Sequence, residues 1–121
     1  MNGKDIFDSI EKIHNNIVNN KDEIEKLDQQ IGDGDHIFNI LRGLEEIKKL
    51  RESLIEKPID QIFKQLGMKI MTTVGGSAGA LFATLLIGMA KNYSSHSSDQ
   101  ENIANMFCEG VEAMKKRGKA D

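Results

Sequence analysis

A tight acidic turn leads directly into a helical pattern in the stretch LDQQIGDGDHIFNILRG, residues 27–43. Its aspartates Asp28, Asp33 and Asp35 fall within eight residues, and carboxylates this close repel one another unless a cation lies between them. Short oxygen ligands on a glycine-containing loop suit Mg²⁺, which binds carboxylates together with substrate phosphates. A solvated turn in which Asp33 or Asp35 caps the following helix accounts for the same residues, so the turn alone leaves both interpretations open.

The composition indicates a single cytoplasmic domain, residues 1–121. Its net charge of −3 argues against nucleic acid as a partner, because binding a phosphate backbone requires a basic face. The first residues carry no signal-peptide pattern, and the longest apolar stretch, at 78–90, is too short to cross a bilayer. The lone cysteine, Cys108, falls in a helical pattern and is expected in the core.

Hydrophobic residues recur with a helical period along almost the whole chain, and no strand alternation interrupts them. Five helices are predicted, at about 4–19, at about 37–54, from Pro58 to the glycine run, at about 78–92 and at about 99–117. A short turn is expected around Ile24 and Leu27.

Four of these helices are expected to bury one face each. The predicted inward stripes are Ile6, Ile10, Ile13 and Ile17 on the first, Ile40, Leu41, Leu44, Ile47 and Leu54 on the second, Ile59, Ile62, Phe63, Leu66 and Ile70 on the third, and Ile103, Phe107, Val111 and Met114 on the fifth.

Together the helices predict an all-α antiparallel bundle. The helix at about 78–92 is apolar nearly all round, which is typical of a central element. Because five helices barely enclose such an element, we expect apolar surface to remain for a partner or a second copy.

The run VGGSAG, residues 74–79, lies between two predicted helices. Backbone amides at a helix start bind phosphate readily, although a glycine run that merely permits close helix packing is an equally simple explanation. It is not a Walker A loop, because no Gly-Lys-Ser/Thr follows. In a bundle of alternating helices this run and the acidic turn lie at the same end, and metal-binding acids beside phosphate-binding amides are what a Mg-nucleotide site requires.

Three sequence blocks resemble the ADP-binding L subunit of the phosphotransferase-system-dependent dihydroxyacetone kinase. They are the acidic turn with its helix (27–43), the run VGGSAG followed by Leu81-Phe82, and Arg117-Gly118-Lys119-Ala120. The resemblance covers essentially the whole chain and implies an antiparallel eight-helix barrel, of which the chain would form an N-terminal part.

The resemblance also implies the ligands and their residues. A pair of magnesium ions would be held by Asp28, Asp33 and Asp35. ADP or ATP would be bound by His36, Ile37, Phe38, Asn39, Ser77, Ala78 and Gly118. No residue is assigned as catalytic, because phosphoryl transfer depends mainly on alignment and charge neutralisation. His14 and His96 lie outside the blocks and are interpreted as incidental.

The implied activity is a phosphoryl relay. A phosphoprotein of the phosphotransferase system would recharge the bound nucleotide, and the phosphoryl group would pass to dihydroxyacetone on a separate K subunit. The chain departs from the family by carrying Ile37 where a glycine is usual, and by its short length.

Other interpretations remain beside the enzyme subunit. One is a non-catalytic helical remnant that associates through uncovered apolar faces, and a homodimer is expected in either case. A fatty-acid-kinase nucleotide domain ranks lower, because its motif usually has threonine at the position of His36. A calcium-binding EF-hand is disfavoured by the aspartate spacing and by the absence of a closing glutamate.

Overall fold

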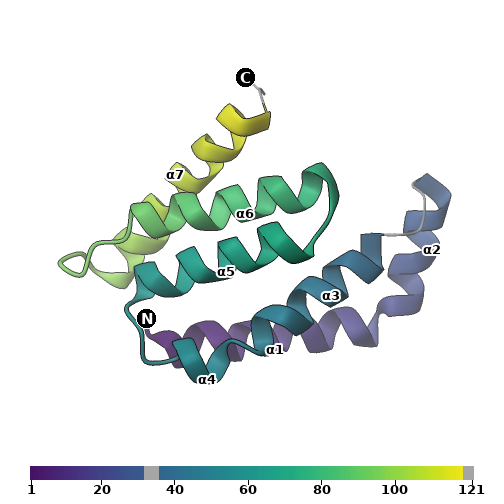
Figure 1. The fold of residues 1–121 in the computed structure, drawn as a ribbon, viewed down its shortest axis with the longest axis horizontal. Coiled ribbons are helices and arrows are strands. Elements are labelled where there is room, and N and C mark those ends of the chain that lie inside the picture. The colour runs from purple at the N-terminus through teal and green to yellow at the C-terminus, as the bar shows by residue number, and fades with distance from the viewer. Residues whose placement is uncertain (32–35, 119–121) are drawn as a thin grey trace.

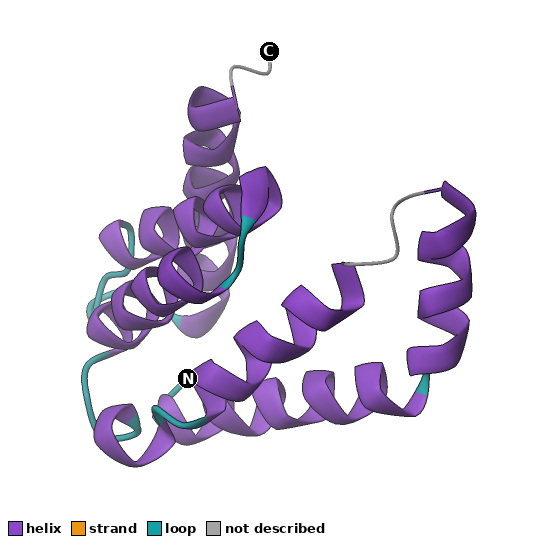
Figure 2. Cartoon of the chain, turned by 45° about the vertical axis from the view of Figure 1, so that its right-hand side comes forward, coloured by secondary structure: helices purple, strands orange, loops and turns teal. Residues whose placement is uncertain are grey.

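A computed structural model of the chain describes residues 1–31 and 36–118, and it describes side chains in these ranges except those of residues 28–37 and 76–78. Within these ranges the regular structure is entirely helical, which confirms the all-α prediction (Figure 2). The described part of the chain forms α1 (Gly3–Asn19), α2 (Lys21–Ile31), α3 (His36–Lys48), α4 (Arg51–Leu54), α5 (Ile59–Thr73), α6 (Gly76–Lys91) and α7 (Asp99–Gly118).

The helices pack mainly on their neighbours in the chain (Figure 1). Contacts run from α1 to α3, from α3 to α5, from α5 to α6 and from α6 to α7, and α2 touches both α1 and α3. The N-terminal ammonium of Met1 forms an ion pair with Asp99, which joins the beginning of α1 to the beginning of α7. Every helix within residues 1–31 and 36–118 falls short of either the length or the apolarity that a bilayer crossing requires.

Local signals explain several of the helix ends. Asn2 and Asp5 form a reciprocal capping box at the start of α1. Ser98 accepts a hydrogen bond from the Glu101 amide (3.2 Å) at the start of α7. Pro58, which was expected at the first helical position, instead caps α5, because its extended ψ of 150° places it just outside the helix.

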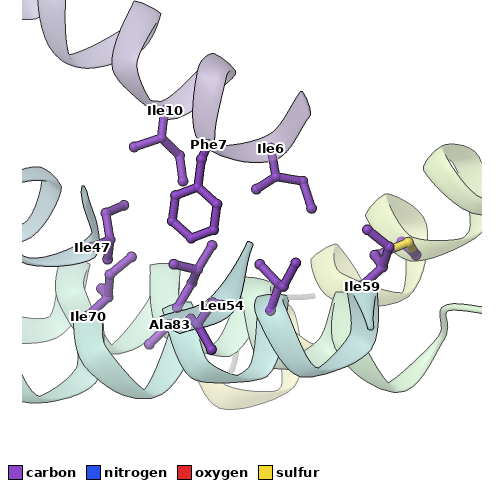
Figure 3. Close-up of a cluster of buried hydrophobic side chains, with 11 residues drawn as sticks. Ile6, Phe7, Ile10, Ile47, Leu54, Ile59, Ile70 and Ala83 are labelled. Atoms are coloured by element: carbon purple, nitrogen blue, oxygen red, sulfur yellow. The ribbon is translucent and has the colours of Figure 1, made fainter. Parts of the chain in front are cut away.

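One core joins α1, α3, α5, α6 and α7 (Figure 3). Phe7, Ile62 and Met106 are its largest fully buried side chains. Burying a large apolar side chain contributes about 1.5–3 kcal/mol, so this cluster is the main source of stability. The predicted stripe on α5 is confirmed: Ile59, Ile62, Leu66 and Ile70 are buried, and Phe63 packs against them.

Two predicted boundaries are wrong. Ile24 and Leu27 lie in an 11-residue helix, α2, rather than in a short turn. Asp22 and Glu23 in the first turn of α2 stabilise the helix by interacting favourably with its dipole. The helix also packs against α1 and α3. The helix predicted at 37–54 is divided at Lys49–Leu50 into α3 and α4, without a glycine or proline to signal the break.

The predicted inward face of α7 is also wrong. Ile103 and Phe107 are exposed (56% and 55%), whereas Asn102, Met106 and Gly110 are buried. A Cβ built on Gly110 would lie 2.8 Å from the Leu85 carbonyl oxygen, so α7 turns its smallest residue toward α6.

Two further core predictions are wrong. Cys108 is exposed rather than buried, and Ile13 of the α1 stripe is exposed while Ile6 and Ile10 are buried. The predicted central helix, α6, packs against α5 and α7, yet its Phe82 remains half exposed.

Candidate functional site

Two of the sequence blocks begin helices at the same end of the molecule. α3 begins at His36 and α6 begins at Gly76, both toward the right-hand side of Figure 1. A Cβ built on Gly43 of α3 would lie 2.5 Å from Val74 Cγ2, so the absence of a side chain lets α3 approach the turn before α6 closely.

The third block, at the end of α7, contacts α6. α7 ends at Gly118, and a Cβ built there would lie 3.4 Å from Leu81 Cδ2 on α6. The end of α7 is therefore in van der Waals reach of the second turn of α6, and α6 with the turn before it (Val74 and Gly75) lies between α3 and α7.

An arginine joins the two first blocks. Arg42 Nη2 on α3 donates a hydrogen bond to the Thr73 carbonyl oxygen at 2.6 Å, and it lies 3.4 Å from Asn39 Oδ1. Thr73 is the last residue of α5, and the final carbonyls of a helix lack intrahelical partners. Arg42 thus supplies a partner to one of them immediately before the glycine turn.

A polar strip continues from Arg42 along the α3–α5 contact. Glu46, one turn further along α3, lies 3.9 Å from Lys69 Nζ on α5 and 3.0 Å from Lys49 Nζ. The hydrogen bond from Lys49, with the nearby charges of Lys69 and Arg42, holds the pKa of the Glu46 carboxyl below its ordinary value. The Glu46–Lys69 pair thus adds one exposed ionic contact between α3 and α5.

The beginning of α6 suits an anion. Its N-cap residue, Gly75, is extended (φ −78°, ψ 168°) and gives no side-chain cap hydrogen bond, and the first turn contains no acidic residue. The first amides of a helix have no intrahelical acceptor and carry the positive end of the helix dipole. A phosphate group could therefore occupy the position that a capping side chain takes in other helices.

An apolar groove of about 370 Å³ lies beneath this end of the molecule. Four helices and the glycine turn line it, with Ile13 and Ile17 from α1, Ile40 and Leu44 from α3, Ile70 from α5, Val74 from the turn, and Gly79 and Phe82 from α6. α3 and α6 therefore line the same groove.

The predicted metal ligands lie largely outside the part of the chain that the structure describes. Asp28 belongs to α2, without a described side chain, and Asp33 and Asp35 fall outside the described residues. Among the side chains that are described, no group of three His, Cys, Asp or Glu residues gathers as a metal site would. The magnesium site therefore stays a prediction.

The predicted nucleotide-binding residues divide into two groups. His36 and Ile37 begin α3, and Ser77 and Ala78 lie in the first turn of α6, all without described side chains. The other three are described: Phe38 is exposed with Lys21 Nζ 5.3 Å from its ring centroid, Asn39 is half-buried beside Arg42, and Gly118 is exposed at the end of α7.

Two residues were missed as structural determinants. His14, interpreted as incidental, is buried, with Nε2 2.6 Å from Glu45 Oε1 and Nδ1 3.4 Å from Lys48 Nζ, so it ties α1 to α3. His96 is exposed, as expected for a residue outside the site.

Arg42 belongs to the acidic-turn motif, but no function was predicted for it from the sequence. Its position three residues after Asn39 places both residues on one helix face.

Comparison with known proteins identifies relatives of the whole region. Residues 30–121 match the family model described as the DAK2 domain. The chain is 38% identical to the ADP-binding subunit DhaL of PEP-dependent dihydroxyacetone kinase 1 from Listeria innocua, over 86% of this chain and 52% of that protein.

Two further relatives carry similar names. The ADP-binding subunit DhaL of the PTS-dependent dihydroxyacetone kinase from Lactococcus lactis is 35% identical over 90% of this chain and 55% of its own length. The corresponding PEP-dependent subunit from Escherichia coli is 35% identical over 78% of this chain and 46% of its own length. The chain thus spans about half the length of these curated relatives.

Proposed function

Because the chain belongs to the DAK2 domain family, we propose that it is a Mg-nucleotide-binding subunit of a dihydroxyacetone kinase. It would carry a phosphoryl group from a phosphoprotein of the phosphotransferase system to dihydroxyacetone held by a K subunit. The names of the relatives, which are ADP-binding subunits of PEP- or PTS-dependent dihydroxyacetone kinases, support this proposal.

One structural observation carries the nucleotide part of the proposal. The uncapped start of α6 lies next to the helix that follows the acidic turn, and Arg42 connects the two. The first amides of α6 would donate hydrogen bonds to phosphate oxygens, and the carboxylates that precede α3 would bind the Mg²⁺ ions on the same polyphosphate.

The chain's own residues would then bind and orient the ligand. Asp28, Asp33 and Asp35 would hold the magnesium ions, and Ser77 and Ala78 would present backbone amides to phosphate oxygens. His36, Ile37, Phe38 and Asn39 at the start of α3, with Gly118 at the end of α7, would line the rest of the nucleotide site. The bound metal and nucleotide would supply charge neutralisation and the transferable phosphoryl group.

Calorimetry with ADP tests this proposal directly. We expect the purified chain to bind ADP with an affinity that rises when Mg²⁺ is added, because the carboxylates can approach the phosphates only through a cation. A sample that retains its helical circular dichroism but binds no ADP, with or without Mg²⁺, would contradict the nucleotide-binding function.

A specific observation favours self-association as well. Ile103 and Phe107 form an exposed apolar stripe on α7. Exposed large apolar side chains in one place typically mark an interaction surface. We therefore propose a homodimer formed through α7, which would also serve the alternative of a non-catalytic remnant.

Sedimentation velocity checks the dimer. We expect wild-type protein to sediment as a dimer and Phe107→Glu to sediment as a monomer, because a carboxylate on the stripe would have to be desolvated in the interface. Asn105→Glu adds the same charge at an exposed position on the other side of α7 from Phe107 and should leave the dimer intact. A wild-type monomer at tens of micromolar would contradict self-association.

A further inference from the structure

We propose that His14 forms a pH-sensitive link between α1 and α3: a neutral imidazole joins a carboxylate to an ammonium group, and in acid a proton takes the place of the ammonium group. The ring is buried in the α1–α3 contact, with 11% of its side chain exposed. Its Nε2 lies 2.6 Å from Glu45 Oε1, and its Nδ1 lies 3.4 Å from Lys48 Nζ. None of these three residues belongs to the proposed nucleotide site, so the link is independent of the proposed function.

The two neighbours on α3 decide where the ring carries its hydrogen. An ionised carboxylate only accepts hydrogen bonds, so Nε2 must donate to Glu45. An ammonium group only donates, so Nδ1 must be unprotonated in order to accept from Lys48. A single state of the ring satisfies both contacts, namely the neutral imidazole with its hydrogen on Nε2.

A second proton on the ring changes the two contacts in opposite directions. Protonated Nδ1 and the Lys48 ammonium are both donors with like charge, so this contact is lost and the half-buried lysine turns toward water. The contact with Glu45 becomes an ion pair and is strengthened. Glu45 therefore favours the second proton and Lys48 opposes it.

Glu45 and Lys48 are the charged groups that contact the ring in the part of the chain that the structure describes. On α1 itself, Glu11 lies one turn earlier and is exposed, and Asp8 lies further along the helix, where it pairs with Arg51 of α4. α2 also packs on α1, but its described side chains form neither an ion pair nor a hydrogen bond with the imidazole. The second protonation is therefore governed by the two groups on α3.

The link lies beside the apolar groove. The residues that immediately precede its three members, Ile13, Leu44 and Ile47, all line this groove. The link consequently joins α1 to α3 where these helices form two of the groove walls.

Two variants test the link through the pH dependence of urea unfolding between about pH 8 and about pH 5.5, the range in which histidine titrates. Lys48→Met leaves a carboxylate as the only charge beside the ring. The folded state then binds the proton more tightly than the unfolded chain does, so acid should stabilise this variant relative to wild type. Glu45→Gln keeps an oxygen that can accept from Nε2 but leaves only the ammonium charge, so acid should destabilise it relative to wild type.

The two variants should differ strongly in their response to acid. We expect each partner to alter proton binding by about threefold, because both are partly open to solvent. The acid-induced change in the equilibrium constant for unfolding should therefore differ by about tenfold between Lys48→Met and Glu45→Gln. Equal responses to acid in the two variants would overturn the proposal.

Lys49→Met is the matched control. Lys49 follows Lys48 directly and pairs with Glu46 at 3.0 Å instead of with the ring. Its replacement removes the same charge, and its response to acid should equal that of wild type. The exposed His96 is present in every variant and contributes equally to all of them.

A second readout uses wild-type protein and does not require a folded variant. Nitrogen chemical shifts of the imidazole ring distinguish its two neutral tautomers. At about pH 8 we expect His14 to carry its hydrogen on Nε2. A ring that carries its hydrogen on Nδ1, or one that is already doubly protonated at this pH, would overturn the proposal.

Discussion

Replacing Asp33 and Asp35 together with alanine is expected to abolish Mg-dependent ADP binding, with a loss of more than about 100-fold in affinity. Both residues belong to the acidic turn between α2 and α3. Carboxylate oxygens are the ligands that Mg²⁺ prefers, and a single remaining aspartate, Asp28, cannot hold the metal against water. Calorimetry with and without Mg²⁺ measures the loss, and far-ultraviolet circular dichroism verifies that the helices remain.

A matched control uses two other acidic residues close by. Asp22 and Glu23 are exposed in the first turn of α2, and their joint replacement with alanine removes the same net charge from the same end of the chain. We expect the control to bind Mg-ADP as wild type does. Retained binding in the Asp33/Asp35 variant, or equal loss in both variants, would contradict the metal assignment and leave only a general effect of negative charge.

The helices were predictable wherever a segment buries one face against one neighbour. On α5, Ile59, Ile62, Leu66 and Ile70 are buried as their spacing indicated, because α3 and α6 cover that face. The apolar pattern of α2 was too sparse to predict a helix, since only Ile24 and Leu27 mark a face before Ile31. The break between α3 and α4 has no glycine or proline to signal it. α4 lies beside the first half of α1, where Arg51 Nη2 donates to Asp8 Oδ1 at 3.1 Å.

The error on α7 has a different origin. Periodicity identifies the most apolar face of a helix but not the face that its partner covers. α6 covers Gly110, whose lack of a side chain permits close approach. Met106 lies in the core, and Asn102 exchanges hydrogen bonds with Ser94 in the loop before α7 (2.9 Å each). The more apolar face, with Ile103 and Phe107, is left without a neighbour in the described structure.

The sequence predicted which residue types form the candidate site and at which end of the bundle they lie. The spacing of the acidic turn and the glycine run indicated a common end, and the contacts of Gly43 with Val74 and of Arg42 with Thr73 agree. The connection itself was not predictable, because a side chain on one helix that satisfies a carbonyl on another leaves no periodic signal. The buried His14 was missed for the same reason.

Gly79→Ala is expected to destabilise the fold by about 1–2 kcal/mol, because a methyl group has no room beneath the glycine turn. A Cβ at this position would overlap the Val74 carbonyl oxygen and lie 2.8 Å from the Val74 carbonyl carbon and 2.9 Å from its Cγ1. Two of these atoms are backbone, so the turn rather than a flexible side chain must move. The better helix propensity of alanine, worth up to about 1 kcal/mol, offsets only part of this cost. Urea unfolding without nucleotide measures the free energy of unfolding.

Gly75→Ala distinguishes this steric effect from a general need for glycine in the run. Nothing lies within 4 Å of a Cβ at Gly75, and its φ of −78° suits any residue. Its free energy of unfolding should therefore stay within about 0.5 kcal/mol of wild type. Equal stability of the two variants would mean that Val74 does not lie over the first turns of α6. A difference between them would establish that Val74 packs directly on α6 at Gly79.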